Sequence, residues 1–355
     1  MIELGYALSS EEHPPNDLVR YARLAEETGF SFAFISDHYH PWIDRQGQSP
    51  FVWSVLGAIA HATRRLRVGT GVTCPTIRMH PAIIAQAAAT TAAMMPGRFF
   101  LGVGSGENLN EHITGCHWPP PDVRLEMLEE AVEVIRLLWQ GGTRDHRGRY
   151  YTVENARLYT LPPEPPPIVV AAAGPRAAET AGRIGDGLVS TSPEREILQQ
   201  FEKAGGGGKP RYGQVAVCWA RDEAAARRTA HEWWPNAGLK GPLTVELALP
   251  AHFEAAASLV REEDVAKKIV CGPDPERHVE QIRKFADAGY EYVYVHQIGP
   301  DQEGFFDFYR REIMPRLREP RSAEGAWRRR ARGRARERTP RRPAGGRRAS
   351  GRSAR

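Results

Sequence analysis

A short polar stretch at residues 36–42, SDHYHPW, holds residue types suited to proton chemistry. It places Asp37, His38, His40 and Trp42 within six residues, directly after the apolar run FAFI. Histidine exchanges protons near neutral pH, so it can take the hydroxyl proton of an alcohol during oxidation. An Asp-His pair after a strand is also typical of a helix cap beside an ordinary surface histidine, and the spacing alone leaves both interpretations open.

Two other apolar runs end in carboxylates. Residues 9–12 read SSEE and include Glu11, and the stretch GVGSGENLNE supplies Ser105, Glu107 and Asn110. The glycines of GVGSGE allow backbone N–H groups to approach an anion, and a following helix would add its N-terminal dipole. Glu107 could equally cap that helix. The placement of all these residues at run ends, rather than any one of them, favours a functional site.

Small residues mark two more run ends. Gly71 and Val72 in GTGVTCP predict a bulge or strained turn where a flat ring could pack. Residues 171–174, AAAG, are followed by Pro175 and would allow phosphates to approach the backbone closely.

Eight short apolar runs alternate with helical stretches along the chain. This alternation predicts parallel strands with helical crossovers, and eight of them favour a closed (β/α)8 TIM barrel. A doubly wound sheet usually has fewer strands and a G-x-G-x-x-G turn after the first, which is missing here. The predicted strands are 4–8, 32–37, 66–73, 99–106, 166–174, 187–192, 212–219 and 291–299.

Two insertions interrupt this repeat. Residues 142–162 alternate like a small hairpin, and residues 235–273 contain a helical piece near AHFEAAASLVREEDVAKK. In a TIM barrel the C-terminal ends of the strands form the mouth that carries the active site. We therefore expect the polar run ends to meet at one mouth, with insertions supplying walls.

The net charge of +5 conceals two regions of opposite sign. From Arg316 onward the sequence has 16 arginines and three glutamates, a local charge of +13, which leaves residues 1–315 at −8. Residues 319–355 are predicted to be a disordered Arg-rich tail after a barrel domain of residues 1–318. The tail could bind nucleic acid, but the acidic body argues against it, and a dispensable extension is the favoured interpretation.

The sequence predicts a cytoplasmic protein without a metal site. No apolar stretch is long enough to span a membrane, the N-terminus does not resemble a secretory signal, and the four cysteines form no CxxC pair. The HYH spacing, with Cys116 and His117 elsewhere, lacks a paired ligand set at metal-site spacing.

These motifs together resemble the luciferase-like monooxygenase superfamily, in its branch of F420-dependent oxidoreductases typified by glucose-6-phosphate dehydrogenase. The resemblance runs through SDHYHPW, LRVGTGVTCPT, HPAIIAQAAAT, GRFFLGVGSGENLNE and YVYVHQIGPDQEGFF, over roughly residues 2–318. It implies a TIM barrel, usually a homodimer, that holds the deazaflavin coenzyme F420 at its C-terminal mouth.

The resemblance also implies roles for individual residues. His38 matches the catalytic base, Trp42 a tryptophan that closes the pocket, Glu107 a candidate acid and Glu11 a further pocket carboxylate. Gly71–Val72 falls at a non-prolyl cis peptide that supports the deazaflavin ring, and Asp37 matches a neighbour of that ring. The other expected cofactor contacts are Cys74, Ser105, Gly106, Asn110, Ala173 and Gly174.

One departure bears on the substrate. Thr191 matches a residue at the substrate phosphate of the sugar-phosphate enzymes, but Glu194 replaces a nearby lysine. A carboxylate there would repel a dianion unless Arg195, Lys267 or Lys268 compensates. Thr191, Arg195 and Lys267 are the expected substrate-binding residues. An uncharged secondary alcohol or ketone, or another sugar phosphate, is therefore expected ahead of glucose 6-phosphate.

Two alternatives remain at this point. The same barrel could bind FMN and act as an oxygen-dependent monooxygenase with a reductase partner. The protein could instead be a nucleic-acid binder that acts through its tail, with steep salt dependence.

Overall fold

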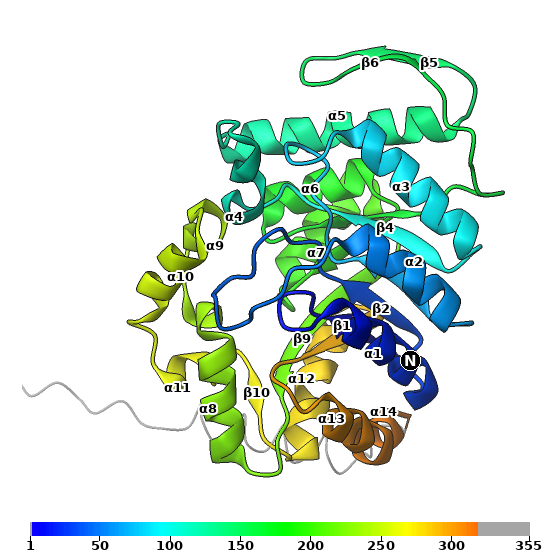
Figure 1. The fold of residues 1–355 in the computed structure, drawn as a ribbon. Coiled ribbons are helices and arrows are strands. Elements are labelled where there is room, and N and C mark those ends of the chain that lie inside the picture. Colours follow the sequence, from blue (N-terminus) through cyan, green and yellow to red (C-terminus); the bar gives the residue numbers. More distant parts are fainter. Residues whose placement is uncertain (1, 319–355) are drawn as a thin grey trace, which may run out of the picture. The chain divides into compact units, whose positions relative to one another are not determined.

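The computed structural model describes residues 2–318, and eight parallel strands close into a barrel there (Figure 1). The order β1-β2-β3-β4-β7-β8-β9-β11 closes through pairing of β11 with β1, so the predicted TIM barrel is confirmed. The strands are β1 (Glu3–Leu8), β2 (Phe32–Ile35), β3 (Arg67–Thr70), β4 (Phe99–Val103), β7 (Ile168–Ala171), β8 (Gly187–Ser190), β9 (Arg211–Cys218) and β11 (Tyr292–Gln297).

Helices surround these strands (Figure 1). Several begin with proline in the first turn, where the missing N–H costs no helical hydrogen bond. They are α1 (Pro15–Thr28), α2 (Val52–Ala62), α3 (Pro81–Met94), α4 (Asn108–Glu111), α5 (Pro121–Trp139), α6 (Pro175–Ile184), α7 (Arg195–Phe201), α8 (Glu223–Trp233), α12 (Pro275–Ala288), α13 (Gln302–Phe308) and α14 (Met314–Arg318).

Aromatic side chains fill the barrel interior. Phe34 and Tyr294 stack with their ring centroids 4.5 Å apart, and Phe100 stacks on Tyr212 at 5.7 Å. Side chains alternate between the two faces of a strand, so residues two positions beyond these point along the same interior toward the mouth. His296, two residues after Tyr294, is one of them.

The insertions form separate structures. Between α5 and β7, β5 (Arg144–Arg147) and β6 (Thr152–Ala156) make an antiparallel hairpin (Figure 1). The second insertion holds α9 (Leu243–Glu246), α10 (Pro250–Ala257), α11 (Glu262–Val265) and β10 (Val270–Cys271), which pairs with β9. Its predicted helical piece is divided between α10 and α11, because the chain turns where the Val260 N–H bonds to the carbonyl of Ala257.

The structure bears on the prediction about membrane spans but not on those about the Arg-rich tail. Within residues 2–318 no helix is long and apolar enough to cross a membrane. The predicted disorder of residues 319–355, and any binding of nucleic acid through them, lie outside the described residues.

Candidate active site

A histidine–glutamate pair lies at the barrel mouth. Glu11 follows β1 and His38 follows β2, and Nε2 of His38 is 3.4 Å from Oε1 of Glu11. Ser36 donates a hydrogen bond to Glu11 Oε2 at 2.6 Å, and Ser9 donates to the same atom at 3.1 Å. Burial opposes ionisation of Glu11, but the charge of His38 and the Ser36 hydrogen bond outweigh it and lower the pKa of Glu11.

The loop that carries His38 is held from α4. Oδ1 of Asn110 accepts hydrogen bonds from the backbone N–H groups of Tyr39 at 2.9 Å and His40 at 3.2 Å. Nδ2 of Asn110 points to Glu107, whose Oε2 is 3.5 Å away. Asn110 is buried, so its side chain supports the loop beneath the mouth, and Glu107 is only partly buried.

The second insertion supplies an apolar wall. Trp42 lies with its ring 5.0 Å from the His38 ring and makes an edge contact with Phe253 of α10 at 5.2 Å. Leu239 and Leu247 pack into the same cluster. The pocket-closing tryptophan implied by the resemblance is therefore next to His38 and held by residues far along the sequence.

Asp37 belongs to a buried network below this mouth. Thr73 donates to its Oδ2 at 2.7 Å and Arg78 donates to its Oδ1 at 2.9 Å. Arg78 also faces Glu111, whose Oε2 accepts the Arg78 backbone N–H at 2.7 Å. Burial raises the pKa of Glu111 to about 7, although its contacts with Arg78 pull the other way. Arg78 and Glu111 could not be singled out from the sequence, because burial of a charged residue is a property of the folded chain.

Small residues follow β3, the strand that pairs with β2, after which His38 stands. The Gly71–Val72 peptide bond is cis, at the position implied by the resemblance. Val72 and Ala171 are partly buried and pack on the barrel core, and a Cβ on Gly104 would lie 2.8 Å from Cγ2 of Val72. This surface can support a planar ring.

Two further glycines, Gly106 and Gly174, follow the paired strands β4 and β7. Gly106 has φ of +80°, and a Cβ there would lie 2.5 Å from Sγ of Cys74, so glycine is required for both conformation and space. Cys74 is buried behind it, and burial raises the pKa of its thiol. Gly174 is the N-cap residue of α6, and no side chain accepts a hydrogen bond from the first N–H groups of that helix. A Cβ at Gly174 would have no atom within 4 Å. Ser105 and Ala173 are at least partly exposed. The free N–H groups at the start of α6 suit a phosphate.

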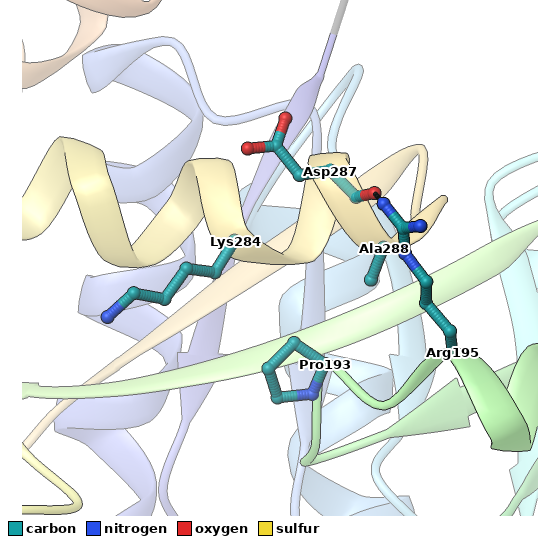
Figure 2. Close-up of a pocket in the computed structure, with 5 residues that line it drawn as sticks. All are labelled: Pro193, Arg195, Lys284, Asp287 and Ala288. Carbon is teal, nitrogen blue, oxygen red and sulfur yellow. Dashed lines mark hydrogen bonds between the residues drawn. The ribbon is translucent and has the colours of Figure 1, made fainter. Parts of the chain in front are cut away.

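The predicted substrate-binding residues are not all brought together. Thr191 is exposed just after β8, and Ser192 donates to Oε1 of Glu194 at 3.0 Å beside it. Arg195 instead turns to α12 and donates to the carbonyl of Asp287 at 2.8 Å, in a surface pocket shared with Lys284 (Figure 2).

Lys267 is two-thirds exposed and pairs with Asp264 at 2.7 Å on its own segment. Arg195 and Lys267 thus have other partners, and their contacts give no support to the expectation that they compensate Glu194. Each cation binds a partner close to it: Arg195 is the first residue of α7 and reaches α12, and Asp264 lies one turn before Lys267.

A second histidine–glutamate pair was not singled out from the sequence. Nε2 of His296 is 2.7 Å from Oε2 of Glu12, and Oε1 of Glu12 accepts the Gly299 N–H at 2.9 Å. Both side chains are buried. The available signal was the alternation in YVYVHQ, which places His296 on the same face as Tyr292 and Tyr294.

The sequence model of the luciferase-like monooxygenase family matches residues 1–292. This chain belongs to the luciferase-like monooxygenase family. Within residues 2–318, no group of three or more His, Cys, Asp and Glu residues could hold a metal ion in this family member.

Relatives of this family member include F420-dependent enzymes. An F420-dependent glucose-6-phosphate dehydrogenase from Nocardia farcinica is 38% identical, covering 89% of this chain and 98% of that protein. The same enzyme from Microbacterium testaceum is 37% identical, with coverage of 89% and 98%. An F420-dependent secondary alcohol dehydrogenase, solved with an F420-acetone adduct, has a TM-score of 0.82 and 31% identity and covers 90% of this chain and 99% of that one.

Proposed function

We propose that this chain is a coenzyme F420-dependent dehydrogenase or reductase that moves a hydride between the carbinol carbon of a substrate and the deazaflavin. The observation that carries the proposal is the His38–Glu11 pair beside Trp42, at the mouth of a family barrel with small-residue surfaces. F420-dependent relatives over nearly the full barrel support the same cofactor.

His38 is the group proposed to exchange the hydroxyl proton. Its Nε2 faces Glu11, and its Nδ1 lies 3.2 Å from the carbonyl of His40, which can hold the ring in place. In the oxidation direction the neutral ring keeps its proton on Nδ1, toward the His40 carbonyl, so that Nε2 can accept the hydroxyl proton. Glu11 then stabilises the charged ring. Glu107, partly exposed across the mouth, is the candidate acid.

The residues present fit a deazaflavin coenzyme. Val72, Gly104 and Ala171 would support its ring, and the N–H groups at Gly174 and the start of α6 would hold its phosphate. Asp37, Cys74 and Asn110 would act from the layer beneath, because their side chains are buried against protein groups. When bound, the deazaflavin supplies hydride chemistry with little reactivity toward oxygen.

The proposed substrate is an uncharged secondary alcohol or the corresponding ketone, ahead of glucose 6-phosphate. Glu194 lies exposed beside Thr191, while Arg195 and Lys267 have partners elsewhere. A carboxylate there repels a phosphate dianion. The aromatic wall of Trp42 and Phe253 favours an apolar flank on the substrate.

A cytoplasmic homodimer belongs to the same proposal. All four cysteines are free thiols, which suits a reducing compartment. Phe51 before α2 and Ile83 on α3 are more than half exposed, so these two helices offer apolar side chains to a second copy.

The test is turnover of F420 with a panel of secondary alcohols, ketones and sugar phosphates. Replacing His38 with Ala should abolish hydride transfer and leave cofactor affinity nearly intact. The matched control is His146→Ala. It removes a histidine of the β5–β6 hairpin whose Nε2 lies 3.1 Å from Oε1 of Glu130 on α5. Equal loss of turnover and affinity in His38→Ala would make His38 a cofactor ligand instead.

The role of Glu194 has its own variant. Glu194→Lys restores a cation beside Thr191 and should raise turnover of sugar phosphates relative to uncharged alcohols. If this ratio does not change, the substrate phosphate does not bind beside Glu194.

A further inference from the structure

The mouth holds two histidine–glutamate pairs, and the two histidines differ in the partners of their ring nitrogens. Both ring nitrogens of His38 face oxygen acceptors, on His40 and Glu11. His296 uses only Nε2, which donates to Glu12 at 2.7 Å. A carboxylate at one nitrogen fixes the tautomer and leaves the other nitrogen of the neutral ring with its lone pair free.

Nδ1 of His296 is left without a hydrogen-bond partner within residues 2–318, although the side chain is buried. This atom is not among the fully buried unpartnered side-chain atoms of these residues. His296 follows Tyr294 by two residues on β11, so its ring lies on the interior face at the mouth. His296 and His38 both act electrostatically on the carboxyl of Glu11, as expected if they border one mouth. Nδ1 is therefore a preformed hydrogen-bond acceptor.

A donor lies on the neighbouring strand. Gln214 of β9 is in register with Tyr294, one inward step below His296. Its Oε1 accepts a hydrogen bond from the Tyr294 hydroxyl at 3.1 Å, which orients the amide. The only side-chain hydrogen bond of Gln214 within the described residues is the one that Oε1 accepts, so Nε2 has no partner there, and the side chain is only partly buried. An amide donor and an imidazole acceptor thus lie on adjacent strands of the barrel interior, with Gln214 one layer below His296.

An aromatic ring borders the same place. Trp234, at the end of α8, meets the His296 ring edge-on with centroids 4.6 Å apart. A hydroxyl group both donates and accepts, so it can satisfy Nδ1 of His296 and Nε2 of Gln214 together. An anion would be disfavoured by Glu12 behind His296.

We propose that His296 and Gln214 form a subsite that binds a hydroxyl group of the substrate other than the one that is oxidised. The inference rests on the proposed alcohol chemistry and narrows it to neutral substrates with a second hydroxyl, such as polyols or unphosphorylated sugars. Glu12 is a positioning residue, because it acts by orienting His296.

Turnover gives the first test. With F420 present, kcat/KM is compared for cyclohexanol, the cyclohexanediols and myo-inositol. At least one polyhydroxyl compound should exceed cyclohexanol, and Gln214→Met should reduce that preference about fivefold, the value of one hydrogen bond. His296→Phe combined with Glu12→Gln, which avoids an unpaired buried carboxylate, should reduce it similarly. His146→Phe on the hairpin is the control and should leave the preference unchanged.

Nitrogen NMR of the histidines gives a readout without turnover. In the full chain with F420, the preferred polyhydroxyl compound should shift the Nδ1 signal of His296, and cyclohexanol should not. Preference for cyclohexanol, or no shift of Nδ1, would overturn the subsite even if F420 is reduced. A shift of Nδ1 without any F420 reduction would support the subsite and contradict the proposed dehydrogenase.

Discussion

At the scale of single residues, the mouth combines groups whose roles the sequence could suggest with groups whose burial it could not. Glu11 and His38 stand out because each directly follows an apolar run, and the structure puts them 3.4 Å apart. Glu111 looks like an ordinary helical glutamate in ENLNE, yet it is fully buried against Arg78. Its protonation is therefore set by packing that only the folded chain creates.

Glu111 should make stability fall as the pH rises. The ordinary pKa of a glutamate is 4.5, and burial raises the pKa of Glu111 to about 7. The folded state therefore holds the proton to higher pH than the unfolded state, and it loses roughly 3 kcal/mol of stability as the pH rises between these two values. Glu111→Gln should remove this fall and be the more stable protein above neutral pH. Denaturant unfolding at several pH values measures the slope.

The control for this slope is Glu133→Gln on the exposed side of α5. It should keep the wild-type pH dependence. A Glu111→Gln protein with an unchanged slope would show that Glu111 ionises normally in the folded chain.

At the scale of elements, the strands were predictable and their side-chain partners were not. The eight strands follow from short apolar runs between helices, and the Gly71–Val72 interruption from a glycine inside one run. The directions of long side chains were not predictable, because Arg195 could have reached the mouth but turns to α12. Asn110 shows the same limit, since it supports the His38 loop from α4.

Asn110→Ala should disturb the His38 loop. It removes the acceptor for the N–H groups of Tyr39 and His40, which should lower stability by about 1–3 kcal/mol. A displaced His38 should lower kcat roughly 10- to 100-fold. Asn110→Asp keeps the acceptor and should recover part of the loss, limited by repulsion from Glu107. Equal kcat in the Ala and wild-type proteins would mean that Asn110 does not position His38.

At the scale of the whole molecule, a closed barrel explains how distant residues share one mouth. Strand closure brings β11 beside β1, so His296 reaches Glu12 although 284 positions separate them in sequence. The formal charge is distributed unevenly along the chain, since residues 1–315 carry −8 and the remaining residues carry +13. A negative body repels the phosphate backbone of nucleic acid.

Truncation after Arg318 tests the proposed division at residue 318. The shortened chain should keep the melting temperature and F420 affinity of the full chain, measured side by side. Any nucleic-acid affinity of the full chain should fall steeply as the salt concentration rises, and the truncated chain should have none. Loss of F420 affinity on truncation would assign residues 319–355 to the functional unit.

The most direct test of the central claim is a binding titration of the purified protein with coenzyme F420 and, separately, with FMN, followed by fluorescence quenching. The proposed function predicts saturable, tight binding of F420 and none of FMN. Binding of FMN without F420 would contradict the dehydrogenase and favour a flavin-dependent monooxygenase in the same barrel.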